Sequence, residues 1–207
     1  DCSHCTTILT NRKISAEYFS FHTTDAEYQL LEKIRHIPKT KFLAGNADFA
    51  LGIVTGNNKK YISSVKNKDN EVILKGSDIC KYHTNPNSNY IVFNPQNFQQ
   101  VAPIEMYRAP EKLLYRFISS QLVFAYDDKQ TLSLNSCNLV IPKLEGLHIK
   151  YILAILNSRI AQFIYKMEFH SVKVLRSHIE NIPILDVNAD MQNSIIQAVE
   201  PLINGLP

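Results

Sequence analysis

Apolar residues recur at every third or fourth position in three parts of the chain, which is the spacing of one face of an α-helix. The first part is residues 25–37, where Asp25 stands at the position expected of an N-cap and Pro38 ends the segment. A longer core helix is predicted over residues 146–169, and an amphipathic last helix over residues 189–204.

Between these helices the apolar residues alternate or form short runs bounded by Gly, Asn and Pro, a pattern that indicates strands and turns. Residues 49–65 are predicted to form a hairpin, in which a turn over residues 55–58 joins two strands. Further short strands are predicted over residues 71–76, over residues 89–93, and four times within residues 113–141. A strand-rich middle flanked by helices indicates an α+β fold with a mixed or mostly antiparallel sheet.

Composition is that of an ordinary globular protein. Apolar residues make up 45% of the 207 residues and charged residues 20%. No apolar run approaches the roughly 20 residues that cross a bilayer, so no membrane association is expected. The four cysteines are too few and too scattered for a disulfide framework, which indicates a cytoplasmic location.

The chain begins at Asp1 instead of Met, and we therefore expect it to be a segment of a longer protein. Three parts are predicted. Residues 1–24 form an N-terminal extension without an assigned role, residues 25–187 form one domain, and residues 188–207 form a C-terminal helix. This helix could join the core or continue into a following segment.

Charge is unevenly placed along the chain, although the net charge is only +3. Residues 59–82 carry six basic and three acidic side chains, and residues 146–187 carry five basic and three acidic ones. Two basic zones on a nearly neutral protein indicate a local surface for a polyanion.

Common catalytic motifs are missing from the sequence. GIVTGNNKKYI (52–62) fits neither the phosphate-loop nor the dinucleotide template. NPQNF (94–98) lacks the second proline of an Asn-Pro-Pro-aromatic methyltransferase motif and is predicted to be a turn. There is no G-x-S-x-G motif and no pair of histidines at helical i, i+4 spacing. Cys2 and Cys5 with His4 between them are half of a zinc site without a second half. We therefore predict no catalytic residue and no metal site.

Five motifs nevertheless follow one another in a characteristic order. They are GIVTGNNKKYI (52–62), ILKGSDICKY (73–82), KLLYRFISSQLVFAYDD (112–128), YILAILNSRIAQFIY (151–165) and VLRSHIENIPI (174–184). In this order they resemble the TaqI-like C-terminal specificity domain, the target recognition domain attached to adenine-specific DNA methyltransferases and fused restriction–modification enzymes. The resemblance extends over residues 35–185.

The resemblance implies a fold related to the recognition domains of type I specificity subunits. It also implies recognition of a short sequence in double-stranded DNA, which directs a methyltransferase domain, linked in cis or present as a subunit, to its target. On this interpretation the chain is not an enzyme by itself. It is a part of an adenine-specific DNA methyltransferase or type II restriction–modification enzyme, and S-adenosylmethionine is expected in the linked catalytic domain and no cofactor in this one.

Candidate DNA contacts follow from the predicted hairpin and from the basic zones. A two-stranded ribbon fits the major groove, where Asn pairs bidentately with adenine. Thr55, Asn57 and Asn58 are therefore candidate base readers, and Lys59 and Lys60 are candidate phosphate contacts. The remaining candidates for phosphate contact are Arg116, Lys143, Lys173 and Arg176.

Other positions have structural interpretations. Arg116 could instead lie on the solvent face of a strand, and Arg176 could cap the preceding helix. Tyr61 is predicted to pack within the protein, and Asn157 and Ser158 are predicted to permit close packing or to satisfy a nearby loop.

Two further classes of function stay open at this point. The chain could be a protein–protein interaction module that uses its last helix, or an enzyme domain with an unrecognised site. The concentration of lysines in residues 59–82 favours DNA recognition, because a protein-binding module has no need of a basic hairpin.

Overall fold

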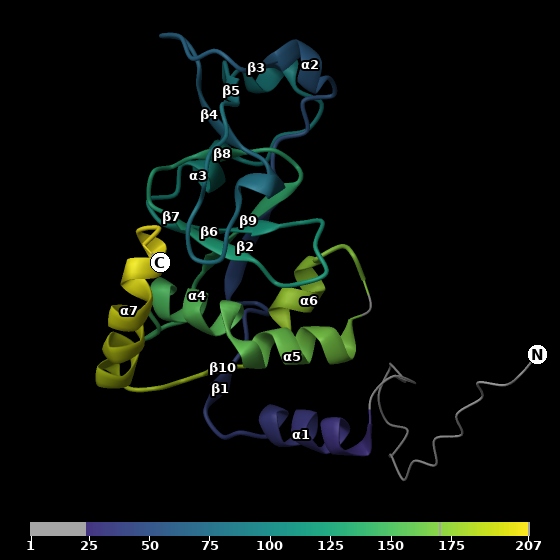
Figure 1. Ribbon diagram of the computed structural model, residues 1–207, viewed down its shortest axis with the longest axis vertical. Helices are drawn as coiled ribbons and strands as arrows, with labels where there is room; N and C mark the ends of the chain where they lie inside the picture. The colour runs from purple at the N-terminus through teal and green to yellow at the C-terminus, as the bar shows by residue number, and fades with distance from the viewer. Residues whose placement is uncertain (1–23, 170, 207) are drawn as a thin grey trace, which may run out of the picture.

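The computed structural model describes residues 24–169 and 171–206, so the predictions for Cys2, His4 and Cys5 lie outside the described residues. Figure 1 shows an elongated molecule with strands in the middle, most of the helices at one end, and a small lobe at the other. The helices are α1 (Asp25–Arg35), α2 (Asn58–Tyr61), α3 (Ile104–Tyr107), α4 (Ile149–Asn157), α5 (Arg159–Glu168), α6 (Arg176–Glu180) and α7 (Ala189–Ile203), with 3-10 turns η1 (Gly76–Asp78) and η2 (Pro95–Asn97).

Within the described residues the strands form three sheets. They are β1 (Thr40–Lys41), β2 (Ala47–Ala50), β3 (Ile62–Ser63), β4 (Glu71–Leu74), β5 (Tyr90–Ile91), β6 (Lys112–Arg116), β7 (Phe124–Asp127), β8 (Leu132–Ser133), β9 (Cys137–Pro142) and β10 (Ile184–Leu185). The central sheet has the order β2-β9-β6-β7 and is antiparallel throughout. The lobe sheet has the order β3-β5-β4-β8 and contains one parallel pair, β4 with β8, while β1 pairs with β10. The predicted α+β fold with a mixed sheet is confirmed.

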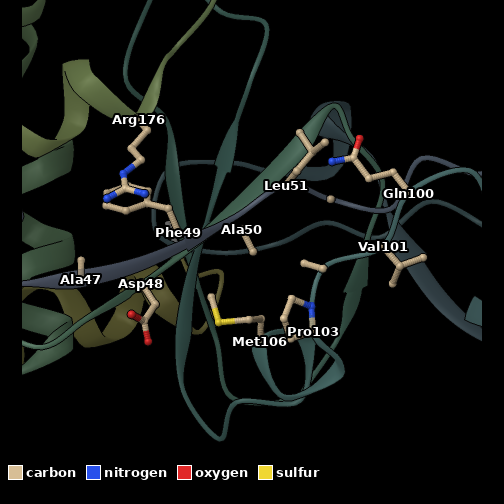
Figure 2. A pocket seen from close by; sticks show the side chains of 12 residues that line it. Ala47, Asp48, Phe49, Ala50, Leu51, Gln100, Val101, Pro103, Met106 and Arg176 are labelled. Carbon is tan, nitrogen blue, oxygen red and sulfur yellow. The ribbon is translucent and has the colours of Figure 1, made fainter.

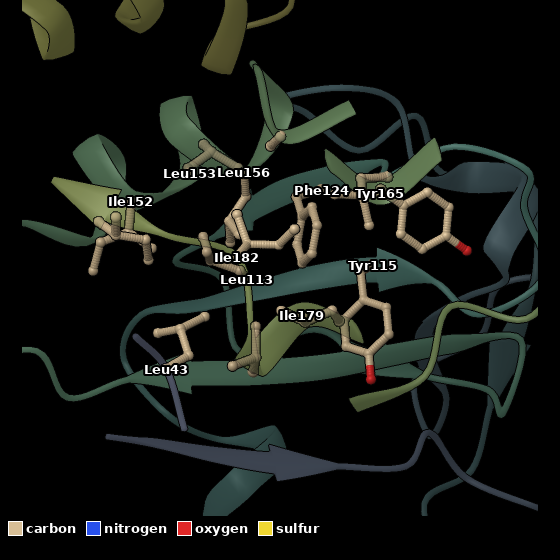
Figure 3. Close-up of a cluster of buried hydrophobic side chains, with 14 of the residues drawn as sticks. Leu43, Leu113, Tyr115, Phe124, Ile152, Leu153, Leu156, Tyr165, Ile179 and Ile182 are labelled. Atoms are coloured by element: carbon tan, nitrogen blue, oxygen red, sulfur yellow. The ribbon is translucent and has the colours of Figure 1, made fainter. Parts of the chain in front are cut away.

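The central sheet separates two hydrophobic cores, because successive residues of a strand point to opposite faces. On β6, Leu113 and Tyr115 pack into the core on the helix side, whereas Leu114 between them packs into the core of the lobe. On β9, Val140 faces the helices and Leu139 faces the lobe. Figure 3 shows the helix-side core, in which side chains from the sheet and from α4, α5 and α6 meet. The sheet therefore anchors the lobe and the helices to one another.

The long helix predicted over residues 146–169 is in fact two helices, α4 and α5, which meet at Ser158. Ser158 has an extended backbone, and its hydroxyl caps α5 by accepting a hydrogen bond from the Ala161 N–H at 3.1 Å. The preceding residue, Asn157, is buried, and its side chain bonds the N–H and the C=O of Phe124 on β7 at 3.0 and 2.9 Å. The structural role predicted for Asn157 and Ser158 is confirmed.

The first and last helices lie where the sequence pattern predicts them. The N-cap of α1 is Thr24, which forms a capping box with Glu27, so the assignment of Asp25 as the N-cap was wrong. Helix α7 packs against α4 and joins the core: Gln192 of α7 accepts a hydrogen bond from the His148 N–H at 2.8 Å.

The predicted hairpin over residues 49–65 is wrong. Strands β2 and β3 do not pair with each other, since β2 pairs with β9 and β3 pairs with β5. The chain between them contains helix α2 in place of a tight turn. Gly52 lets the chain pass close to a distant segment, because a Cβ on this residue would lie only 2.1 Å from the Leu134 carbonyl oxygen. This close contact with a distant segment overrides the local turn preference.

Candidate nucleic-acid interface

Short-range hydrogen bonds shape the one-turn helix α2 at the far end of the lobe (Figure 1). Asn57 is its N-cap, and the side-chain oxygen accepts a hydrogen bond from the Lys60 N–H at 3.2 Å. Thr55 is only 4% exposed, and its hydroxyl donates to the Asn58 side-chain oxygen at 2.6 Å and accepts from the Asn57 N–H at 3.1 Å. The Thr55 hydroxyl is thus occupied inside the protein, whereas the side-chain NH2 groups of Asn57 and Asn58 have no acceptor in the described part of the chain.

Two segments at this end of the lobe carry four exposed lysines between them (Figure 1). Lys59 and Lys60 belong to α2, and Lys66 and Lys68 belong to the loop between β3 and β4. The four lysines, Lys59, Lys60, Lys66 and Lys68, are called the lysine tip below. Within residues 24–169 and 171–206, none of the four forms an ion pair, although the Lys60 ammonium lies 4.9 Å from the centroid of the Tyr61 ring. No direct ion pair in the described part of the chain neutralises the lysine tip, whose one acidic neighbour in the loop sequence 66–70 is Asp69, so the tip presents an excess of positive charge.

The loop that carries Lys66 and Lys68 is held by two asparagines. Asn70 is nearly buried; its side-chain oxygen accepts from the Asn67 N–H at 2.9 Å, and its NH2 donates to the Val65 carbonyl at 2.9 Å. The Asn67 side chain accepts in return from the Asn70 N–H at 3.0 Å. Because Asn side chains that bond nearby backbone groups fix turns, the two lysines stand on an ordered loop.

A chain of aromatic rings connects the lysine tip with the core of the lobe. The Tyr61 ring meets the Phe98 ring edge to face, with centroids 5.3 Å apart, and Phe98 in turn contacts Phe93. Phe93 contacts Tyr107, whose hydroxyl donates to the Leu51 carbonyl at 2.9 Å. Tyr61 packs within the protein, as predicted, and aromatic contacts of this kind add rigidity to the end of the lobe.

The structure places two of the other candidate cations in contacts with the protein. The Arg116 side chain is partly buried and donates to the Ile79 carbonyl at 2.7 Å, so it holds the segment that follows η1. Lys143 is exposed but pairs with Asp48 of β2 at 2.5 Å.

The last two candidates lie on the helix side of the sheet. Arg176 begins α6, pairs with Glu180 at 2.7 Å, and lies over the Phe49 ring at 5.1 Å. Lys173 is exposed beside Ile118, to which its backbone is bridged, and it has no ion pair among the described residues. Figure 1 shows α6 far from α2, so the structure does not bring the nine predicted contacts into one cluster.

A shallow hollow of about 400 Å³ lies between β2 and the segment that precedes α3. Figure 2 shows Arg176 and Gln100 at opposite ends of it, with Met106 and Pro103 along one side. The ionisable residues among those that line it are Asp48 and Arg176. This lining provides neither a nucleophile next to a base nor a set of metal ligands.

Buried ionisable groups elsewhere in the described residues serve the fold. Lys112 is fully buried, with its ammonium 2.5 Å from the Asp127 carboxylate and 2.8 Å from the Tyr107 carbonyl. Burial raises the pKa of the Cys137 thiol, which keeps it protonated and unreactive. Across residues 24–169 and 171–206, no group of three His, Cys, Asp or Glu side chains is arranged to hold a metal ion. No helix in the same ranges is long and apolar enough to span a membrane.

Comparison with known proteins assigns the family. Residues 71–184, more than half of the chain, match the TaqI-like C-terminal specificity domain. The chain belongs to this family. The match covers β4 to β9 and helices α3 to α6, whereas the motif GIVTGNNKKYI and its two lysines lie before it.

Relatives of this specificity domain come from restriction–modification systems. The type II methyltransferase M.VspI of Vibrio sp. (strain 343) is 40% identical over 63 residues, which are 30% of this chain and 15% of that protein. The fold resembles a chain from a type I restriction–modification system at 13% identity, with a TM-score of 0.53, over 86% of this chain and 43% of that one.

Two restriction enzymes contain a similar fold. The type IIG restriction endonuclease BpuSI gives a TM-score of 0.54 at 12% identity, over 84% of this chain and 28% of the enzyme. The type IIL enzyme MmeI, solved in complex with DNA, gives 0.51 at 11% identity, over 76% of this chain and 27% of the enzyme. The chain thus spans less than half of each of these relatives.

Family membership decides between the classes of function that the sequence leaves open. The chain is a specificity domain with a role in DNA target recognition, and such a domain is non-catalytic in itself and needs no cofactor.

Two lysines of the tip were not among the predicted contacts. Lys66 and Lys68 contribute to the basic zone, but no motif marks them in the sequence. The available signal is Asn67, which lies between the two lysines, and Asn70, which follows them; both are residues typical of an ordered turn.

Proposed function

We propose that this specificity domain binds double-stranded DNA through the end of its lobe and so places a methyltransferase domain on its target. The observation that supports this proposal is the lysine tip, where four exposed ammonium groups have no ion pair among the described residues. Uncompensated lysines on an ordered surface neutralise DNA phosphates and release counterions.

Roles differ among the residues at this end. Lys59 and Lys60 contact phosphates, and Asn57 and Asn58 use their free NH2 groups toward base edges. Thr55 acts indirectly, because its buried hydroxyl holds the Asn58 side chain in place.

The four more distant candidates would form a second, weaker contact. Lys173 is available for a phosphate without rearrangement, since it is exposed and has no ion pair among the described residues. Lys143 would exchange the exposed Asp48 carboxylate for phosphate, and Arg176 would exchange the partly buried Glu180 carboxylate. Ion pairs of exposed cations such as these contribute little stability. Arg116 would have to give up its bond to the Ile79 carbonyl, so we rank it last.

The parent protein is proposed to be an adenine-specific DNA methyltransferase or a type II restriction–modification enzyme of the cytoplasm. The similarity to M.VspI supports a type II parent, and the fold shared with a type I system fits a separate specificity subunit equally well. Residues 25–187 would be the recognition domain, with α7 packed on α4 as the connection to the next segment. S-adenosylmethionine would be held by the methyltransferase domain, and DNA recognition by this chain does not use it.

Fluorescence anisotropy of a labelled random-sequence duplex, titrated with the 207-residue chain at several salt concentrations, tests the proposal. Four phosphate contacts predict a logarithmic salt slope of about −3.6, at about −0.9 per contact. Binding that is absent at low salt, or that does not change with salt, would contradict it.

A further inference from the structure

Exposed amide side chains from two separate segments lie together at the end of the lobe. One segment is α2 with its N-cap, and the other is η2 with the residues that follow it. The six residues, called the amide face below, are Asn57, Asn58, Gln96, Asn97, Gln99 and Gln100, and all of them are exposed.

Three contacts join the two segments. Val54 and Gln100 exchange two backbone hydrogen bonds, of 2.9 and 3.0 Å. Gly56 lies directly under Gln99, because a Cβ on Gly56 would be 3.4 Å from the Gln99 Cβ. The rings of Tyr61 and Phe98 meet edge to face. The amide face is therefore a single preorganised surface rather than two independent loops.

The amide groups on this face have unused hydrogen-bonding capacity. Within the described residues, the side chains of Gln96, Asn97, Gln99 and Gln100 form no hydrogen bond, and Asn57 and Asn58 use only their oxygens. Gln99 and Gln100 follow Phe98, whose ring is fixed on Tyr61, so their backbone is anchored on both sides.

An amide presents one donor edge and one acceptor edge, which match N7 and the N6 amino group of adenine in the major groove. The phosphate contacts that would set the register are supplied by Lys59 and Lys60, which belong to the same helix as Asn58. We infer that the amide face reads adenine-containing base pairs and determines the target sequence of this domain. The inference rests on the proposed DNA binding by the lobe.

The test is selection of duplexes from a pool that carries roughly ten randomised base pairs, about one helical turn, by the 207-residue chain. The wild-type chain is expected to enrich a motif that contains A·T pairs. In N97A/Q99A the ratio of motif to random-duplex affinity should fall at least about fivefold, which corresponds to the loss of one bidentate pair. The salt slope on random duplex should stay unchanged, since no cation is removed.

Two further variants sharpen the test. N97D/Q99E keeps the side-chain shape but leaves only acceptors, so the preferred base should change from adenine toward cytosine, whose amino group is a donor. The matched control is N193A/Q197A, which removes two exposed amides from α7 and should enrich the wild-type motif.

The outcomes separate the two proposals. Enrichment of one and the same motif by wild type, N97A/Q99A and N97D/Q99E would overturn the amide face as the reading surface and leave DNA binding intact. Binding by wild type without any enriched motif would have the same meaning. Failure of wild type to bind any duplex at low salt would overturn the proposed function and this inference with it.

Discussion

The ring of Tyr61 stands edge to face against the ring of Phe98, with the two centroids 5.3 Å apart. Tyr61 ends the helix that carries Lys59 and Lys60, and Phe98 ends the turn that carries Gln96 and Asn97. This one contact therefore couples the cations of the lobe to its amides. The functional end of the domain is fixed by packing, although both segments are short.

Replacement of Phe98 by alanine should weaken this coupling. We expect F98A to lower the free energy of unfolding by about 1–3 kcal/mol, because a half-buried aromatic ring and two aromatic contacts are lost. Urea titration followed by circular dichroism measures the change. F98L lacks the ring but keeps most of the apolar volume and should cost less than half as much. No measurable loss in F98A would show that the contacts of this ring are unimportant for stability.

A methyl group at Gly52 should be poorly tolerated. The added Cβ would lie 2.1 Å from the Leu134 carbonyl oxygen and 2.5 Å from that of Cys137, so the backbone between β8 and β9 must move. We expect G52A to cost more than about 3 kcal/mol. At Gly146 the φ angle is +78° but no atom lies within 4 Å of the added Cβ, so G146A should cost only about 1 kcal/mol. Thermal unfolding of both variants gives the comparison, and similar melting temperatures would rule out the close contact.

Asn157 is predicted to be a major contributor to stability despite its polar side chain. N157A removes both hydrogen bonds to Phe124 and leaves the buried Phe124 N–H without a partner, whereas the Phe124 carbonyl keeps the bond from the Tyr82 N–H at 2.7 Å. The change should cost about 1–3 kcal/mol. N193A, on the exposed face of α7, is the matched control and should change stability by less than about 0.5 kcal/mol. A small effect of N157A would mean that β7 and α4 are held by apolar packing alone.

Acid should destabilise the protein partly through His178. The imidazole is 8% exposed and stacks on Phe169 at 4.1 Å, and its Nδ1 accepts from the Leu175 N–H at 3.2 Å. Burial lowers the pKa of His178 below its ordinary value of 6.5, so between the two pKa values the unfolded chain binds the proton more tightly than the folded one. The contribution of His178 to stability is therefore complete above pH 6.5 and is lost as pH falls through the folded pKa.

Urea titrations at several pH values between about 7 and 5 measure this loss. H178F removes the titrating group and keeps an aromatic ring, so the stability of that variant should depend less on pH over this window. If wild type and H178F show the same dependence, His178 does not contribute to acid sensitivity.

Much of the fold could be predicted from the sequence, because the spacing of apolar residues along a helix or strand follows from the face that is buried. The short strands within residues 113–141 and the last helix lie where the spacing of apolar residues places them. Pairing partners leave no such local record. Residues 49–65 look like a hairpin, yet β2 pairs with β9 and β3 pairs with β5. These partners are distant in the sequence, and turn residues do not specify such pairing.

The break between α4 and α5 could not be predicted either, because it also depends on contacts between distant segments. The apolar period of the predicted core helix continues through Ile160, but this side chain is 59% exposed. The helix is interrupted because Asn157 bonds to β7 and Ser158 caps a new helix, and both interactions depend on tertiary contacts.

The candidate site was predicted only in part for a related reason. Lys59 and Lys60 could be identified because they follow a recognisable motif. Gln99 and Gln100 could not be identified, because residues 94–98 look like a simple turn. The significance of these two glutamines comes from contacts with Gly56 and Val54, which are distant from them in the sequence.

A charge-reversal experiment shows whether the lysine tip contacts DNA phosphates. K59E/K60E is compared with K33E/K166E, which reverses two exposed lysines on α1 and α5 and changes the net charge equally. The measurement is the salt dependence of anisotropy on a random-sequence duplex. The account predicts weaker binding by K59E/K60E, with a slope reduced by about two units, and a slope close to wild type for K33E/K166E. Equal slopes for the two variants would contradict it.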